Sequence, residues 1–374
     1  MEFEPFSYMR HAKRLEYTAG IYMAGSGMPP AKVEDAGFTD DDYALKTLCA
    51  SYGDPRNVDF IASRYKTSGN NVVLTQGSSE GYFLAFGALL EPGDKVIIET
   101  PGYQQFNSLT TFFGCRPVPL KRRFENKWNP DLKEFKRLLD DKTKIVVLTD
   151  LHNPTMSKMP PDLLKDMIAA AAKNGTTVIV GEVYKDHLKP GDNDESCFEY
   201  GDNVIATSSL TKVYGLSAIR FGWALAPERI AGRMLDVMDM VDPEMPAICQ
   251  NLAWKALHNL PRMRAIARGI HERHWPIVEE WLKQRDDIEY LKPAGGITVW
   301  IHADGLKDTG NLVQVMRNEF GVLVVPGEYF QAPGWFRVGY KNPPGELRDG
   351  LSRIGRAIDD YRKTHKSQKI KPGK

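Results

Sequence analysis

Between residues 70 and 227 the sequence alternates short runs of β-branched residues with segments of helical periodicity. The strand-like runs lie at 70–77, 95–100, 143–154, 176–184, 203–212 and 220–227. Helical segments such as 132–139, which places leucine and phenylalanine along one face, separate them. A chain that passes from strand to strand through helices builds a mostly parallel sheet covered by helices on both faces. The alternation therefore predicts an α/β protein.

The pattern changes after about Arg229, where long helical segments precede strand-like runs at 295–303, 321–327 and 335–340 and a last helix at 345–363. A chain of 374 residues usually forms more than one core. We therefore expect a large α/β domain and a smaller α+β C-terminal domain. The predicted division is an N-terminal segment at 1–40 that contributes to the small domain and the functional site, a large domain at 41–260, a small domain at 261–362 and a disordered basic tail at 363–374.

Charge and composition argue against several classes of partner. The formal net charge is +1, so no long-range field attracts nucleic acid. No apolar run approaches the roughly eighteen residues of a membrane-spanning helix, and the N-terminus lacks the apolar core of a signal peptide. The four cysteines form no CxxC pair and no histidine lies at ligand spacing, which argues against a metal site and for reduced thiols. We expect a cytoplasmic protein that binds neither metal, membrane nor nucleic acid.

Polar residues that directly follow the strand-like runs are the candidates for a site, because ligands of open parallel sheets bind beyond the carboxyl ends of the strands. In chain order they are Gly77, Ser78, Ser79, Tyr103, Asn153, Tyr184, Ser209, Lys212 and Arg220. Serine hydroxyls, the N–H groups of a helix start and a guanidinium suit a phosphate. Tyr103 offers a face to a flat ring, and Asn153 and Tyr184 can hydrogen-bond a ring hydroxyl. Lys212 lies between the phosphate-binding residues and the ring-binding residues, where its amine can form a Schiff base.

Several of these residues stand in motifs of a known family. The stretch "SLTKVYGLSAIRFG" at 209–222, "HNPT" at 152–155, "QGSSEG" at 76–81 and "EVY" at 182–184 resemble motifs of fold-type I pyridoxal-phosphate enzymes of the class I/II aminotransferase group. The resemblance extends from "YMAGSGMPP" at 22–30 to "WFRVGY" at 335–340. It implies a homodimeric enzyme with pyridoxal 5′-phosphate as cofactor, an amino acid as substrate and a seven-stranded, mostly parallel sheet in the large domain.

The resemblance also implies roles for individual residues. Lys212 is the catalytic residue that carries the Schiff base, and Arg337 in "FRVGY" grips the substrate α-carboxylate, with Gly27 and Asn153 as further substrate-binding candidates. The cofactor-binding candidates are Ser78, Ser79, Tyr103, Asn153, Glu182, Tyr184, Ser209, Lys212, Arg220 and Tyr52. Tyr52, in "YGDP", is expected to reach the phosphate bound by the neighbouring subunit.

Each of these residues also has a structural explanation when it is taken alone. A lysine after "SSLT" is more often structural, and "GSSEG" is a common helix cap. Arg337 could form a salt bridge on a strand face, and Tyr103 is more often a core residue. We interpret His152 as a hydrogen-bonding loop residue rather than a base. The joint occurrence of the candidates, in order and each at a predicted strand end, favours the cofactor site.

Two positions beside the expected cofactor depart from the family pattern. Gly181 stands where the family's D-x-x-Y motif has the aspartate that pairs with the pyridine nitrogen, and Met156 stands where its N-P-T-G loop has glycine. Glu182 is adjacent, but neighbouring residues of a strand point to opposite faces, so only a bulge would aim it at the ring. Without that carboxylate the ring accepts electrons less readily. We expect Gly181→Asp to raise the rate of transamination.

Three functions remain open. The simplest is an aminotransferase in which Lys212 both forms the Schiff base and carries the proton. The second is a lyase or cyclase of specialised metabolism that acts at Cβ or Cγ of an arginine-derived amino acid, since segments 15–27, 101–106 and 127–135 are similar to capreomycidine-synthase-like enzymes. The third is a non-catalytic binding or regulatory descendant, which Gly181 favours mildly and the retained lysine argues against.

Overall fold

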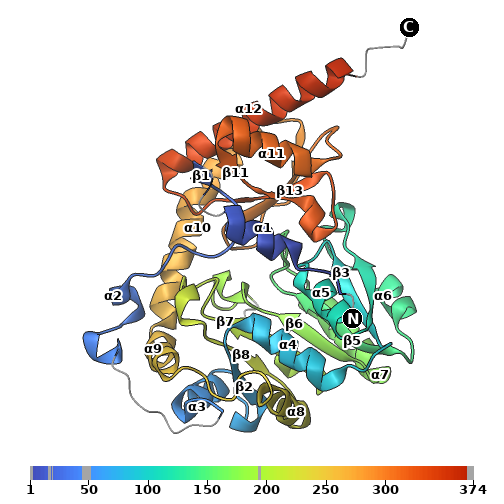
Figure 1. Ribbon diagram of the computed structural model, residues 1–374, viewed down its shortest axis with the longest axis vertical. Helices are drawn as coiled ribbons and strands as arrows, with labels where there is room; N and C mark the ends of the chain where they lie inside the picture. The colour runs from blue at the N-terminus through green and yellow to red at the C-terminus, as the bar shows by residue number, and fades with distance from the viewer. Residues whose placement is uncertain (1–2, 16–17, 19, 44–51, 193–194, 369–374) are drawn as a thin grey trace.

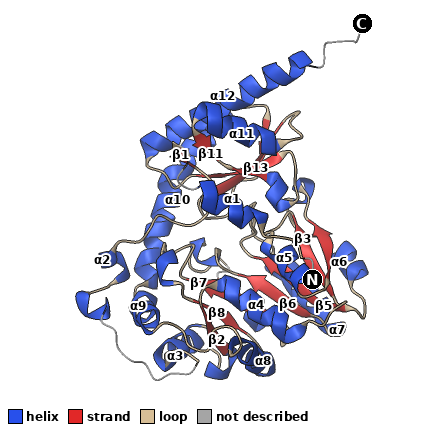
Figure 2. Cartoon of the chain, viewed as in Figure 1, coloured by secondary structure: helices blue, strands red, loops and turns tan. Residues whose placement is uncertain are grey.

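The large α/β body and a smaller body lie one above the other in the computed structural model, which describes residues 3–15, 18, 20–43, 52–192 and 195–368 (Figure 1). Figure 2 shows the strands of the large body between helices on both sides. In this described part of the chain, no helix is both long and apolar enough to cross a membrane.

The large body is built on a seven-stranded sheet, as predicted. Its strands are β2 (Val72–Thr75), β3 (Lys95–Thr100), β4 (Arg116–Lys121), β5 (Thr143–Thr149), β6 (Thr177–Gly181), β7 (Val204–Ser209) and β8 (Gly222–Leu225). Their order is β2-β8-β7-β6-β5-β3-β4. All neighbours are parallel except that β8 runs antiparallel to β2 and β7. The mostly parallel sheet expected from the alternating sequence is therefore confirmed.

Helices cover both faces of this sheet because successive strand residues point to opposite sides. They are α3 (Pro55–Arg64), α4 (Ser78–Leu89), α5 (Gln105–Phe112), α6 (Leu132–Leu138), α7 (Pro161–Lys173), α8 (Glu228–Met238) and α9 (Ala247–His258). In β5, Ile145 and Val147 belong to one buried apolar cluster, whereas Val146 and Leu148 belong to the other. The sheet thus separates two cores, and its strands read as continuous apolar runs.

A smaller antiparallel sheet forms the C-terminal body. Its strands, in the order β12-β13-β10-β9, are β9 (Ile288–Tyr290), β10 (Thr298–Ala303), β12 (Val325–Pro326) and β13 (Trp335–Gly339). The helices of this part are α10 (Leu260–Lys283), α11 (Thr309–Phe320) and α12 (Pro344–Gln368). This sheet and its helices form the smaller C-terminal domain that the sequence predicts.

The N-terminal segment joins the small body. It contains α1 (Ser7–Leu15), β1 (Ile21–Tyr22) and α2 (Val33–Ala36), and β1 pairs in parallel with β11 (Val322–Leu323). Figure 1 shows α1 between the two bodies. This position brings α1 next to the carboxyl ends of the large sheet.

The C-terminal residues differ from the expected disordered tail. Helix α12 continues past Arg362 to Gln368, so the part of 363–374 that the structure describes is helical, and 369–374 lie outside the described residues. The sequence from 362 to 369 contains no glycine or proline, and a helix already formed by packing extends readily through lysine and glutamine. The expectation rested on the many charged and few apolar residues of the tail, and it did not consider that an existing helix can extend into such a segment.

Candidate active site

A cavity of about 340 Å³ lies at the carboxyl ends of β5, β6 and β7 and contains the predicted lysine. Most of the residues singled out in the sequence line it, namely Gly27, Ser78, Ser79, Tyr103, Asn153, Tyr184, Ser209, Lys212 and Arg220. A larger cavity of about 740 Å³ lies between α1 and α11, away from these residues. The structure therefore brings together, in one place, side chains that the sequence spreads from residue 27 to residue 220.

The N-terminus of α4 forms a cup suited to a phosphate. Gly77 precedes the helix with φ of 86° and gives it no side-chain cap, so the first N–H groups of the helix remain available to a ligand. A Cβ on Gly77 would lie 2.7 Å from Nη2 of Arg220, and its positive φ favours glycine. Arg220 donates to the carbonyl of Gln76 at 2.8 Å. The hydroxyls of Ser78 and Ser209 line the same cavity.

Lys212 follows β7 and points its amine at a hydroxyl pair. Its Nζ lies 3.4 Å from Oγ of Ser26, which also accepts a hydrogen bond from the Tyr184 hydroxyl at 3.0 Å. Loss of solvent around the amine lowers the pKa of Lys212, and the charge of Arg337 lowers it further, against an opposing effect of Tyr8. The amine is thus held in one place and made easier to deprotonate.

Arg337 lies on β13 behind two residues that line the cavity. Its side chain is 1% exposed and donates to Oδ1 of Asn153 at 2.9 Å, to the Tyr8 hydroxyl at 2.8 Å and to the Ala24 carbonyl at 3.1 Å. Among the described residues, Nε of Arg337 has no hydrogen-bond partner. A buried guanidinium without a carboxylate partner is costly unless a ligand completes it. The geometry suits a carboxylate ligand.

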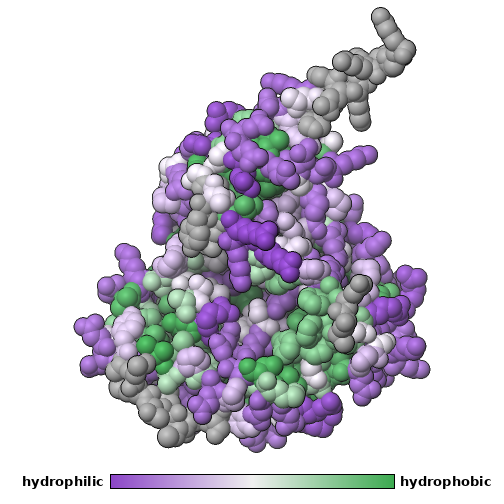
Figure 3. Space-filling model, viewed as in Figure 1, coloured by the Kyte–Doolittle hydropathy of each residue, from purple (hydrophilic) through white to green (hydrophobic). Residues whose placement is uncertain are grey.

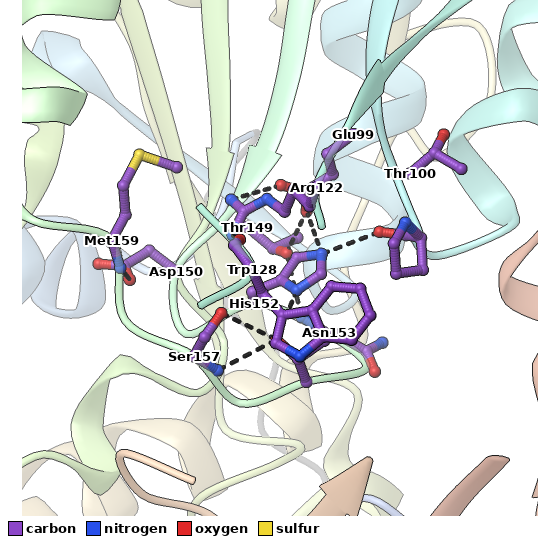
Figure 4. A network of polar contacts seen from close by, with 12 residues as sticks. Glu99, Thr100, Arg122, Trp128, Thr149, Asp150, His152, Asn153, Ser157 and Met159 are labelled. Atoms are coloured by element: carbon purple, nitrogen blue, oxygen red, sulfur yellow. Dashed lines mark hydrogen bonds and ion pairs between the residues drawn. The ribbon is translucent and has the colours of Figure 1, made fainter. Parts of the chain in front are cut away.

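A buried polar network supports the loop that carries Asn153 (Figure 4). Glu99 on β3 pairs with Arg122 at 2.7 Å, and neither side chain is exposed. The Thr149 hydroxyl donates to Glu99 and accepts from the Asn153 N–H at 3.2 Å. Burial raises the pKa of Glu99 to about 7, and Arg122 opposes this rise. The ion pair thus fixes β5 and, through Thr149, the start of the Asn153 loop.

His152 belongs to this network as a hydrogen-bonding loop residue, as the sequence suggested. Its Nε2 lies 2.9 Å from the Pro101 carbonyl and its Nδ1 2.7 Å from the Thr155 hydroxyl. Because a carbonyl can only accept, the proton resides on Nε2 and Thr155 donates to Nδ1. Burial lowers the pKa of His152 far below its usual value. The ring is held neutral and does not line the cavity.

The expectation that Glu182 binds the cofactor is not supported. Its carboxylate accepts from Lys185 Nζ at 3.0 Å, from the Ser196 hydroxyl at 2.7 Å and from the Cys197 N–H at 2.8 Å. Strand alternation directs Glu182 to the face of β6 opposite to that of Gly181, and the pairing of β6 with its neighbours contains no bulge that would turn it.

Tyr52 lies outside the cavity of its own chain. Its side chain is 44% exposed, and its hydroxyl donates to Oδ2 of Asp239 at 3.1 Å. An exposed position on the large body is compatible with the expected reach toward a neighbouring subunit. That role stays a prediction.

Met156 keeps the backbone of a glycine but adds a buried side chain. Its φ is 53°, in the left-handed region that favours glycine, and it is fully buried with Leu151 and Tyr184 in a small apolar cluster. The Met156 carbonyl accepts from the N–H of Ala294 at 3.0 Å, and its sulfur lies close to Gly296. The departure from the family pattern thus faces the small domain rather than the cavity.

Several cavity residues escaped the sequence reasoning. They include Tyr8, Ser26, Tyr82, Thr149 and Lys341. Ser26 adjoins Gly27 in a stretch that resembles the family, and Tyr82 lies four residues after Ser78, hence on the same helical face. These two positions could have been found by extending the motifs. Tyr8 and Lys341 carry no local signal, because only the folded chain brings them to the cavity.

The residues present fit pyridoxal phosphate. The uncapped start of α4 with Arg220 suits its phosphate, the amine of Lys212 suits its aldehyde, and the cavity wall at Tyr103 suits its ring. The unsatisfied Nε of Arg337 suits the carboxylate of an amino acid. Besides the loop glycine replaced by Met156, this chain lacks the family pattern's anionic partner for the ring, because Gly181 stands at that position.

Comparisons with known proteins agree with this geometry. A family model described as aminotransferase class I and II matches residues 39–354. Capreomycidine synthase of Streptomyces vinaceus is 28% identical over 317 residues, which is 83% of this chain and 80% of that protein. An aspartate aminotransferase of Pyrococcus horikoshii is 25% identical over 77% of this chain and 75% of that protein.

A solved structure shows the same fold. A pyridoxal-phosphate-dependent aminotransferase from Streptococcus suis superposes with a TM-score of 0.89 at 24% identity, over 96% of this chain and 99% of that one. The match spans both bodies of the chain. Because the family model also covers most of the sequence, the protein belongs to the class I and II aminotransferase family and is a pyridoxal-phosphate-dependent enzyme.

Proposed function

We propose that this enzyme transfers the amino group of an amino acid, with Lys212 as the residue that attaches the cofactor and moves the substrate α-proton. The observation that carries the proposal is the arrangement of a lysine amine and a phosphate cup around one cavity, with a buried arginine behind it. Pyridoxal phosphate, when bound, supplies an aldehyde that condenses with amines and a ring that accepts the electron pair left on Cα.

Lys212 is suited to the proton transfer. The lowered pKa of Lys212, due first to loss of solvent, increases the neutral fraction of its amine at a given pH. A neutral Nζ can take the proton from Cα of the substrate and deliver it to a neighbouring atom. Ser26, hydrogen-bonded to Tyr184, positions the amine for this transfer.

Arg337 and Asn153 orient the substrate. The guanidinium is held by the Asn153 and Tyr8 side chains. Its Nε has no hydrogen-bond partner among the described residues and can therefore bind the carboxylate of a substrate. A charged N–H donor held in a fixed position can bind one oxygen of a carboxylate. The α-carboxylate bound there would place the amino group and Cα toward Lys212.

The charge of the cavity supports a neutral or acidic substrate side chain. The charged residues among the described cavity lining are Lys212, Arg220 and Lys341, all of them basic. With Lys212 attached to the cofactor and Arg220 paired with its phosphate, Lys341 is the basic group of this lining left to meet a substrate side chain, and it would repel a cationic one. This observation favours aminotransfer from an ordinary or dicarboxylic amino acid over chemistry on an arginine-derived one.

A lyase or cyclase is the second candidate, favoured by Gly181. Without a carboxylate beside the pyridine nitrogen the ring is a weaker electron acceptor, and elimination or replacement at Cβ or Cγ becomes relatively easier than full transamination. The similarity to capreomycidine synthase points the same way. The basic cavity wall argues against its cationic substrate.

We also propose that the enzyme is a homodimer. Large apolar side chains are exposed at Val33, Tyr43, Tyr52, Met240 and Val241. Such side chains in a soluble enzyme often lie at subunit contacts. In the proposed dimer Tyr52 reaches the phosphate in the neighbouring subunit.

The test of the function uses the purified enzyme reconstituted with pyridoxal phosphate. Aspartate, alanine, phenylalanine and arginine are added one at a time without an acceptor, and absorbance and products are followed. We expect stoichiometric pyridoxamine phosphate and 2-oxo acid from a neutral or acidic amino acid. Lys212→Ala should lose the absorbance of the Schiff base between lysine and cofactor and at least about 10²-fold in rate, the usual contribution of a general base.

The same experiment separates the two candidates. Release of ammonia or of a cyclic product, without pyridoxamine phosphate, would reject the aminotransferase in favour of the lyase or cyclase. Lys341→Ala is the matched variant for side-chain preference. If Lys341 favours acidic side chains, this change should weaken the reaction with aspartate more than that with alanine.

A further inference from the structure

Gly181 ends β6 beside the hydroxyl of a tyrosine from another element. A Cβ built on Gly181 would lie 2.3 Å from the hydroxyl oxygen of Tyr82 and 3.2 Å from Cγ2 of Thr149. Real side chains do not tolerate the first distance. The Tyr82 hydroxyl therefore occupies the space in which the side chain of an aspartate at 181 would begin.

Tyr82 is held in this position by rigid packing. It lies on α4, is 4% exposed, and its ring meets that of Phe106 edge to face with centroids 4.9 Å apart. It also lines the cavity that contains Lys212. Because the ring is already fixed by its helix and an aromatic neighbour, its hydroxyl can bind a ligand with little further loss of side-chain entropy.

The hydroxyl is a neutral donor. Burial raises the pKa of Tyr82 well above its usual value, and the neighbouring hydroxyl of Thr207 opposes this rise only in part. A neutral hydroxyl donates a hydrogen bond to an unprotonated pyridine nitrogen, whereas an aspartate carboxylate stabilises the protonated ring. The nearest carboxylate along the chain, Glu182, is engaged with Lys185 on the other face.

We propose that the Tyr82 hydroxyl takes the place of the missing aspartate and donates a hydrogen bond to the pyridine nitrogen of the bound cofactor, which stays unprotonated. Tyr82 and Gly181 then form a matched pair, in which the glycine makes room for the tyrosine. The proposal requires the cofactor in the cavity and is independent of whether the reaction is transamination or cyclisation.

The test is ¹⁵N NMR of the holoenzyme reconstituted with pyridoxal phosphate labelled at the ring nitrogen. The wild type should give the shift of a neutral, hydrogen-bonded pyridine. Tyr82→Phe should move the signal toward that of free pyridine and weaken cofactor binding about 3- to 10-fold, the effect of one neutral hydrogen bond. Thr207→Val, which removes a hydroxyl that neighbours Tyr82, should leave the signal in place.

A second pair of variants tests the exchange of partners. Gly181→Asp alone should bind the cofactor poorly because its side chain meets Tyr82, whereas Gly181→Asp combined with Tyr82→Leu should bind it and show a protonated nitrogen. A pyridinium signal in the wild type would overturn the proposal. So would a signal that moves in Thr207→Val and not in Tyr82→Phe.

Discussion

At the scale of single residues, local motifs predicted the site residues that directly follow strands. Contacts between residues of different elements could not be predicted, because they depend on how the elements pack in the fold. Lys212, Asn153 and Arg220 come from local patterns and meet in one cavity. The motif at Ser78 could have indicated Tyr82 as a cavity residue, but not that its hydroxyl would lie against Gly181, because that contact depends on how α4 packs beside β6. The contact with Tyr82 argues against the gain expected from Gly181→Asp, because the new side chain would begin where the Tyr82 hydroxyl lies.

Met156 gives a residue-scale prediction about stability. Met156→Gly relieves a left-handed backbone, worth about 1 kcal/mol, but removes a fully buried side chain, which costs about 2–5 kcal/mol. We expect a net loss of about 1–4 kcal/mol in the free energy of unfolding, measured by urea denaturation of the holoenzyme.

Lys127→Gly is the matched control for Met156→Gly. Lys127 has nearly the same φ, 52°, but an exposed side chain. Glycine there should stabilise the protein by about 0.5–1 kcal/mol, because strain is relieved without a cavity. If Met156→Gly stabilised the protein as Lys127→Gly does, the assigned packing of the methionine would be wrong.

At the scale of elements, strands were predicted correctly where an apolar run also consisted of residues with high β-propensity. Strand β4 was not recognised, because "RPVPLK" contains two prolines and only one fully buried residue, Leu120. It pairs with β3 alone at the edge of the sheet, where proline is tolerated because one side needs no donors. Strand β4 therefore lacks the continuous apolar run by which the buried strands of this sheet are recognised.

Helix α12 is tied to the end of α10 by an ion cluster, which predicts a pH dependence. Asp287 pairs with Arg285 at 2.7 Å and with Arg362 of α12, and Arg285 also reaches Asp359 at 2.8 Å. Hydrogen bonds from Arg285, then from Arg362, lower the pKa of Asp287 to about 2. A carboxyl with a lowered pKa stabilises the fold above its unfolded value of 3.8, and this stabilisation is lost as the pH falls toward 2.

The variant Asp287→Asn tests this cluster. At pH 7 it should lower the free energy of unfolding by about 1–2 kcal/mol, less than the full shift implies because the pair is partly exposed. The difference from wild type should shrink as the pH falls below 4, as measured by urea denaturation at several pH values. Asp349→Asn, on an exposed pair within α12, should change little. A difference for Asp287→Asn that is constant down to pH 3 would contradict the assignment.

At the scale of the whole molecule, the fold class expected from the sequence is confirmed, and the homodimer expected from the resemblance stays a prediction. Figure 3 shows hydrophobic surface gathered mainly on the large body, whereas the surface of the small body on this side is largely hydrophilic. Patterns along one chain define its own core, but a contact between two copies depends on surface shape. The predicted homodimer therefore needs a direct test.

Mixing two variants tests whether Tyr52 acts across subunits. Tyr52→Phe alone should weaken cofactor binding about 3- to 10-fold, and Lys212→Ala alone cannot attach the cofactor. In a mixed dimer, the Lys212-containing site receives an intact Tyr52 from the other subunit. After equal amounts exchange subunits, about half of the lysine-containing sites should regain wild-type affinity, seen as a biphasic cofactor titration.

In the control, the chain with Lys212→Ala also carries Tyr52→Phe. Neither chain in the mixture then has Tyr52 to contribute to the neighbouring subunit. Its mixture with Tyr52→Phe should stay monophasic and weak. Recovery in neither mixture would place Tyr52 outside the neighbouring site and reject its proposed role.

The contact between Tyr8 and Arg337 has a consequence for the order in which the enzyme becomes competent. These residues are 329 positions apart in the sequence and meet at 2.8 Å behind the cavity. Because the ribosome synthesises a chain from its N-terminus, β13 is made after α1 and after all seven strands of the large sheet. The arginine that is proposed to receive the substrate thus arrives after Lys212 and Arg220, and a nascent chain can complete its large sheet before it is able to select an amino acid.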